Sequence, residues 1–300
     1  RPDGAAWPLA EILREAERRA PAPGAPVSVC VMSNHVHLNT TSLRWVARHA
    51  GLTNVGLGCQ EGEIPEFADF ALVKTVDPGP FLSELTLRHL ADAAKGTGPF
   101  SAVFEEKTRW DLPDGSHAIL YAPRERLPFL TKAKTWASLR VKSATLEGVR
   151  ITPSGPGAYE LSVATMTLDK LAAPVRGLRA RLEGARIIEL SGRPAILRLD
   201  KLDIRQGALT WAELSAALTK RAKAPVSVGT EGGALTARIG TGLLSASARF
   251  EVAASGSSVS LRTRILRFKR TLTRRPPWQP FDVTLADLVL DDDGPRLGAP

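Results

Sequence analysis

The sequence predicts an α+β protein in which a small three-layer α/β N-terminal domain is followed by a mostly antiparallel, curved β domain with one main helix. Three observations predict this class. Helical periodicity alternates with short apolar runs in the first part of the chain, two-residue alternation dominates the second part, and the charge balance changes between them. A length of 300 residues is typical of two domains. We expect them at 1–127 and 139–300, with a linker at 128–138.

The first part reads as helices and strands in alternation, followed by a hairpin. In 9–20, the apolar residues recur at helical spacing, and the β-rich run VSVCVM has the composition of a buried strand. In chain order we predict a helix over 9–20, a strand over 27–32, a helix over 41–50 capped by Asn39 or Thr40 and ended by Gly51, a strand over 70–75, a helix over 81–94 stopped by Gly96, and hairpin strands over 100–110 and 116–122 around the turn sequence DLPDG.

The second part alternates apolar and polar residues with a period of two. In 244–252 the even positions are apolar and all four odd positions are polar or charged, which predicts an antiparallel sheet with one apolar face. The sequences SGPGA, EGGAL and ASGSS punctuate it as turns. One helix, 210–222, interrupts the pattern. Thr210 and Glu213 form a capping box at its start.

Charge and cysteine content leave several functions open. Residues 1–130 carry 13 Lys and Arg against 16 Asp and Glu, whereas residues 131–300 carry 27 against 15. The basic second part suggests an anionic partner, either nucleic acid or acidic lipid headgroups, and a solvated basic surface is the alternative. Two cysteines, Cys30 and Cys59, form neither a disulfide framework nor a zinc cluster, and the sequence leaves open whether they pair.

The sequence CVMSNHVHL raises the possibility of a metal site. In a strand, side chains two residues apart share a face, so His35 and His37 could hold one divalent cation. The stretch resembles the metal-binding strand of HUH single-strand DNA transposases, in which a tyrosine on a helix attacks the DNA phosphate. The two tyrosines, Tyr121 and Tyr159, both fall in predicted strands. A strand-end loop in an α/β domain is the alternative interpretation.

The first part contains, in order, a W-x-x-E-I-L helix and the sequences NTTSLRWVAR, ADFALVKT and LPDGSHAILYAPR. With these pieces it resembles, over about residues 3–124, the soluble segment that follows the membrane helices in GT-C glycosyltransferases of the ArnT and dolichyl-phosphate-mannose type. The resemblance implies an extracytoplasmic location and a membrane domain upstream of Arg1. The catalytic carboxylate of that family lies outside the matching segment, so no catalytic residue, cofactor or metal is expected here.

The second part contains the sequences SATLEGVRI, LRARLEGARI, GALTWAELSAAL, GGALTARIG and LSASARFEVAASGSSVSLRTRILRF. With these stretches it resembles, over about residues 136–298, LmeA-like phospholipid-binding proteins, which are related to the TULIP folds. The resemblance implies that a curved sheet shelters the acyl chains of a phospholipid or lipid-linked sugar at the outer face of a bacterial cell membrane.

The residue pattern agrees in kind, because one helix is too small to cover a large one-sided sheet. An uncovered apolar face costs roughly 25 cal/mol per Å² in water, so the sheet either takes a hydrophobic ligand or closes on itself. The predicted lipid-lining residues are Leu178, Leu182, Leu214, Leu218, Leu244, Phe250 and Leu261. The basic residues predicted to face an anionic membrane surface are Arg179, Arg181, Arg262 and Arg264. We therefore expect a non-catalytic, lipid-binding envelope segment with no nucleic-acid partner. A metal-dependent DNA transposase and a purely structural envelope module are the alternatives.

Overall fold

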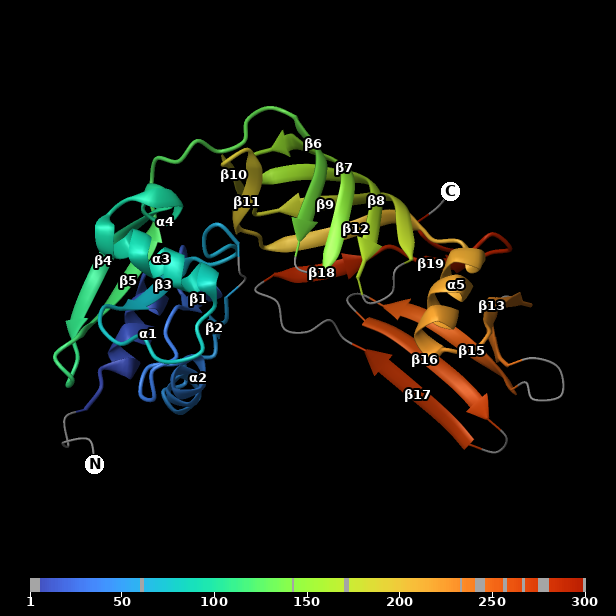
Figure 1. Ribbon diagram of the computed structural model, residues 1–300, viewed down its shortest axis with the longest axis horizontal. Helices are drawn as coiled ribbons and strands as arrows, with labels where there is room; N and C mark the ends of the chain where they lie inside the picture. Colours follow the sequence, from blue (N-terminus) through green and yellow to red (C-terminus); the bar gives the residue numbers. More distant parts are fainter. Residues whose placement is uncertain are drawn as a thin grey trace. The chain divides into compact units, whose positions relative to one another are not determined.

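The computed structural model divides the chain into two compact units, shown in Figure 1. Unit 1 comprises Arg1–Leu130 and Arg186–Leu199, and unit 2 comprises Thr131–Ala185 and Asp200–Pro300. The structure describes residues 6–59, 62–141, 143–169, 173–232, 234–240, 246–255, 258–265, 268–274 and 281–298. Its class is the predicted one, an α/β N-terminal domain followed by a mostly antiparallel, curved β domain with one main helix.

Unit 1 is built on a five-stranded mixed sheet. Its elements are α1 (Leu9–Arg18), β1 (Val27–Val31), α2 (Thr40–His49), β2 (Val55–Leu57), β3 (Phe70–Lys74), α3 (Glu84–Lys95), α4 (Gly98–Val103), β4 (Phe104–Asp111), β5 (His117–Pro123), β10 (Arg186–Leu190) and β11 (Arg193–Arg198). The strand order is β2-β1-β3-β5-β4. β1 runs parallel to both β2 and β3, whereas β5 is antiparallel to β3 and β4.

Two apolar cores, one on each face of this sheet, make unit 1 a three-layer domain. Helices α1 and α2 contribute Ile12, Leu13 and Leu43 to the first core, all of them fully buried. The second core lies on the other face and contains Phe100 of α4 and Ile119 of β5. The hairpin predicted to begin at residue 100 begins only at β4, because residues 98–103 form helix α4.

The β10–β11 hairpin belongs to unit 1, although the sequence analysis assigned it to the β domain. Ile188 and Leu197 of this hairpin lie in the second core together with Phe100, and they are 2% and 1% exposed. The Leu130 amide donates a hydrogen bond of 2.7 Å to the Ile187 carbonyl. The chain therefore crosses between the units three times, and the predicted linker at 128–138 is divided between unit 1 and strand β6.

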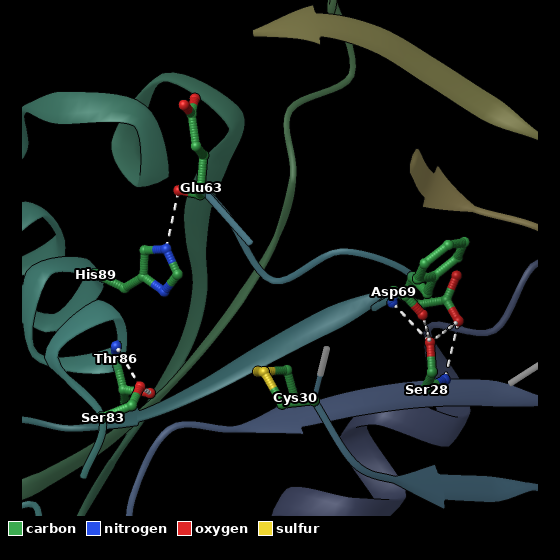
Figure 2. The surroundings of a disulfide bond; sticks show 9 residues. Ser28, Cys30, Glu63, Asp69, Ser83, Thr86 and His89 are labelled. Carbon is green, nitrogen blue, oxygen red and sulfur yellow. Dashed lines mark hydrogen bonds between the residues drawn. A yellow bond between two sulfur atoms is a disulfide. The ribbon is translucent and has the colours of Figure 1, made fainter. Parts of the chain in front are cut away.

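A disulfide between Cys30 and Cys59 ties the long β2–β3 connection to the sheet (Figure 2). Cys30 lies on β1 and is fully buried, and the two Cα atoms are 4.4 Å apart. The far end of the connection is held to β1 by the Asp69 amide, which donates to the Ser28 hydroxyl over 2.9 Å. The disulfide and this bond together fix the loop against the sheet at both ends.

Unit 2 contains two sheets, and the first is long-stranded and curved (Figure 1). Its strands are β6 (Lys134–Val141), β7 (Ala144–Gly155), β8 (Ala158–Leu168), β9 (Pro174–Glu183), β12 (Lys201–Ala208), β18 (Asp282–Leu285), β19 (Leu288–Leu290) and β20 (Pro295–Leu297). The order is β19-β20-β12-β9-β8-β7-β6, and β18 pairs with β12 in parallel. The other pairings of this sheet are antiparallel.

The second sheet of unit 2 is an antiparallel meander with a helix at its first strand. It contains β13 (Val226–Glu231), β14 (Ala234–Ile239), β15 (Ala246–Ser255), β16 (Ser258–Ile265) and β17 (Phe268–Arg274) in chain order, preceded by α5 (Trp211–Ala222). The predicted capping box is present, because the Thr210 side chain accepts from the Glu213 amide and the Glu213 side chain accepts from the Thr210 amide. None of the described helices has the length and apolar character needed to cross a bilayer.

Candidate lipid-binding face and histidine cluster

The first sheet of unit 2 has the predicted alternation along β9. Leu178 and Leu182 are 9% and 2% exposed, whereas Arg179 between them is exposed. Leu178 pairs across the sheet with Val163, and Val163 pairs with Val149, which is also buried. These aliphatic side chains form one continuous apolar row. The two predicted lining residues on β9 are therefore buried on the apolar side of this sheet.

Helix α5 docks on β13, the terminal strand of the second sheet, through side-chain hydroxyls. Thr219 Oγ1 accepts from the Val226 amide over 2.9 Å and donates to the Val226 carbonyl over 3.1 Å. Ser215 Oγ makes the equivalent pair of bonds with Val228 at 2.9 and 3.4 Å. The two hydroxyls, four residues apart on one helix face, satisfy backbone groups that an edge strand otherwise leaves unpaired.

The predicted lining residues of α5, Leu214 and Leu218, are half-buried. At the start of the helix, the Glu213 carboxylate accepts a 2.7 Å hydrogen bond from Arg176 of β9. The hydrogen bonds from Arg176 and Thr210 lower the pKa of Glu213 to about 2. Helix α5 is thus fastened to one strand of each sheet of unit 2.

The second sheet carries several half-buried apolar side chains on its first three strands. Leu235 of β14 pairs with Phe250 of β15, and both are half-buried, as are Val226 and Val228 of β13. Ile239, which pairs with Val226, is 49% exposed. Of the predicted lining residues, Phe250 therefore lies in this set. The sequence-based prediction did not include the β13 residues. The two-residue spacing of Val226 and Val228 was the signal that could have indicated them.

Two predicted lining residues receive no side-chain description. Leu244 lies outside the described residues. Leu261 lies on β16, where the described backbone register pairs it with Val252 of β15 and Leu272 of β17. Apolar positions of the sequence are therefore in register with one another across these three strands.

The predicted basic residues fall on two strands, one in each sheet. Arg179 and Arg181 lie on β9, and Arg181 Nε is 3.2 Å from the Glu183 carboxylate. This ion pair reduces the positive charge that Arg181 offers to a membrane. Arg262 and Arg264 lie on β16, of which the structure describes the backbone register only.

His35 and His37 lie in the loop after β1, whereas the metal-site hypothesis requires them on a strand. β1 ends at Val31. Both imidazole rings contact the indole of Trp7, with centroid separations of 5.2 and 4.9 Å. The His37 amide donates to His35 Nδ1 over 3.3 Å, so this nitrogen already has a partner. No local sequence pattern indicates that Trp7 contacts the two histidines.

A buried lysine and an aspartate adjoin this cluster. Lys74 Nζ, whose side chain is 0% exposed, is 2.9 Å from Asp114 Oδ2, which also lies 4.0 Å from His35 Nε2. Burial would raise the pKa of Asp114, but the hydrogen bonds from Lys74 and Ser116 hold it well below its usual range. Burial and the Lys74 charge lower the pKa of His35, which favours the neutral imidazole.

None of these observations favours the DNA-cleaving alternative. Among the described residues, no group of three or more His, Cys, Asp or Glu side chains is arranged to hold a metal ion. Tyr121 lies on β5 and Tyr159 on β8, and they are 9% and 6% exposed. Neither tyrosine lies on a helix, where the HUH resemblance places its nucleophile.

Comparison with known proteins adds no assignment. No family model, curated protein or solved structure matches this chain.

Proposed function

We propose that this chain is a non-catalytic, extracytoplasmic segment of a cell-envelope protein, and that its β domain binds a phospholipid or a lipid-linked sugar. The observation that carries the proposal is the incomplete burial of apolar side chains in the second sheet of unit 2. Val226, Val228, Leu235 and Phe250 remain half-buried there, whereas the apolar residues at the centre of unit 1 are fully buried. An acyl chain would remove this apolar surface from water.

The packing of α5 supports the same proposal. The helix docks on β13 through Ser215 and Thr219. Its leucines, Leu214 and Leu218, stay half-buried beside the second sheet and are available to a hydrophobic ligand. Apolar sites of this kind bind most of a ligand through aliphatic and aromatic side chains, with a few polar groups that fix its orientation.

The disulfide supports the proposed location. Disulfides persist in oxidising compartments such as the periplasm and the cell surface, and they are rare in the cytosol. The Cys30–Cys59 bond closes a 29-residue separation and holds a connection that has no helix or strand in its described residues. An extracytoplasmic location brings the basic second half of the chain close to anionic headgroups.

The test uses the full chain, because residues 186–199 complete unit 1 and cannot be separated from unit 2 without damage. The purified protein is extracted with organic solvent and the extract is analysed by mass spectrometry. The delipidated protein is then titrated with a fluorescent acyl probe. We expect a co-purifying lipid, and we expect Leu235→Asn to weaken probe binding about tenfold.

Leu87→Asn is the matched control, because Leu87 of α3 is also a partly exposed leucine, at 49%, but lies in unit 1. It should leave probe binding unchanged. If the delipidated protein takes up no acyl probe, or if both variants weaken binding equally, the second sheet is not a lipid site. The structural envelope module would then account for the chain better.

A further inference from the structure

Two loops at one end of the unit 1 sheet expose large apolar side chains. Val36 follows β1 and is 72% exposed, whereas Val76 and Phe81 follow β3 and are 62% and 96% exposed. β1 and β3 are parallel neighbours, so both loops leave the same edge of the sheet. We call Val36, Val76 and Phe81 the apolar tip.

Hydrogen bonds connect these two loops. The Asn34 amide donates to the Pro78 carbonyl over 2.6 Å, and the Asn34 side chain donates to the Pro80 carbonyl over 2.9 Å. Gly79 lies so close that a Cβ there would be 2.3 Å from the Asn34 carbonyl carbon. Pro78 and Pro80 also restrict the backbone. The apolar tip is therefore held by a rigid support. Binding would cost it little additional conformational entropy, because the loops are already ordered.

Buried Lys74 adds a further anchor to this support. Its ammonium donates to the Val76 carbonyl and pairs with Asp114 at the turn between β4 and β5. A fully buried lysine is uncommon unless it is paired. The hydrogen bond from Lys74 to the Val76 carbonyl fixes the backbone of Val76, which is one of the exposed residues of the tip.

Phe81 has two energetically unfavourable features. Its side chain is almost fully exposed, and its φ of 61° lies in the left-handed region that few non-glycine residues adopt. Strained backbone in a rigid loop is a reason to look for a function. An exposed aromatic residue gains free energy when an apolar phase covers it.

The charge and size of the tip decide between the possible occupants. The two loops that carry the tip, residues 33–38 and 75–83, contain one acidic residue, Asp77, and no Lys or Arg. Three side chains offer a few hundred Å² at most, which is well below the roughly 800 Å² per partner of a stable protein interface. A bilayer interface needs no such area, because separate apolar side chains enter it one by one.

We propose that the apolar tip of unit 1 inserts into the interfacial layer of a lipid bilayer. This contact is distinct from the lipid uptake proposed for unit 2, and it depends on different residues. Val36, Val76 and Phe81 would enter the acyl boundary, while the connected loops hold the sheet edge at the membrane surface.

The experiment measures partitioning of the full chain onto vesicles of phosphatidylcholine and phosphatidylglycerol by co-sedimentation. Phe81→Asn removes the aromatic side chain but keeps a residue that tolerates a positive φ. We expect it to lower the partition coefficient about tenfold, with an unchanged urea midpoint. Trp45→Gln is the control, because Trp45 of α2 is an aromatic residue that is 63% exposed outside the tip. It should change partitioning less than about twofold.

Three results would overturn the proposal. These are no binding of the parent protein to vesicles, equal weakening of binding by Phe81→Asn and Trp45→Gln, and a dimer of the parent that Phe81→Asn alone dissociates. The last result would assign the tip to a second copy of the chain. Acyl-probe uptake without vesicles should be normal in Phe81→Asn, so failure of this proposal and failure of lipid binding by unit 2 are separable.

Discussion

Truncating Leu197 of β11 tests whether the β10–β11 hairpin is an integral part of unit 1. Leu197 is 1% exposed and lies in the core that contains Phe100 and Tyr121. Removing three side-chain carbons from such a site costs the transfer free energy of those carbons and leaves a cavity. Leucine-to-alanine changes in packed cores lower the free energy of unfolding by about 2–5 kcal/mol. We expect Leu197→Ala to fall within this range, because Leu197 is almost fully buried in that core.

The assay is urea unfolding combined with native-state hydrogen exchange resolved by segment. Amide protection in β3 and β5 should fall by the same free energy as the global loss, because these strands share the core with Leu197. Val163→Ala is the matched change in unit 2, where Val163 is also 1% exposed. It should lower protection in β7 and β8 first. If Leu197→Ala instead loosens β7 and β8, or costs less than about 1 kcal/mol, the hairpin does not belong to the unit 1 core.

Three further predictions concern the disulfide, a buried carboxyl group and the docking of α5. Cys59→Ser should lower the free energy of unfolding by about 3 kcal/mol in urea, because the bond closes a 29-residue separation in the unfolded chain. Burial, and then the neighbouring Glu63, raise the pKa of Glu66 to about 7, so the folded state favours the protonated group. Stability from this group is therefore complete at low pH and is lost as the pH rises from about 4.5 past 7, and Glu66→Gln should flatten the unfolding free energy over that interval. Replacing Ser215 and Thr219 together by alanine should leave two β13 amides without partners, cost about 1–3 kcal/mol for each, and speed aggregation measured by light scattering.

Local chemistry made several elements predictable from the sequence. Asn39 caps α2 with its side chain, and Thr210 and Glu213 form a capping box, because these bonds depend only on residues two or three positions apart. The alternation of Leu178 and Arg179 likewise gave the buried and exposed sides of β9, since neighbouring residues of a strand point to opposite faces. The class of each domain followed from such patterns.

The unpredicted features depend on partners that are distant in sequence. The sequence of 186–198 is compatible with a hairpin, but nothing local indicates that Leu197 lies in the same core as Phe100 of unit 1. The segment 100–103 is apolar and fits a strand as well as the short helix α4, in which Phe100 and Val103 are both buried. His35 and His37 fit a strand by their spacing, yet β1 ends before them and the loop is fixed by Pro78 and Trp7.

The contrast between the two units follows from where their helices lie. In unit 1 helices cover both faces of the sheet, so Leu13 and Phe100 on opposite faces are both 0% exposed. In the described part of unit 2, one helix, α5, is bound to the terminal strand of the second sheet, and Ser215 and Thr219 occupy the face that docks there. A sheet with one apolar face needs a second layer, and a helix fastened at the edge supplies only part of it. Leu235 and Phe250 of that sheet are half-buried. This incompletely buried apolar surface is what the proposed acyl ligand would remove from water.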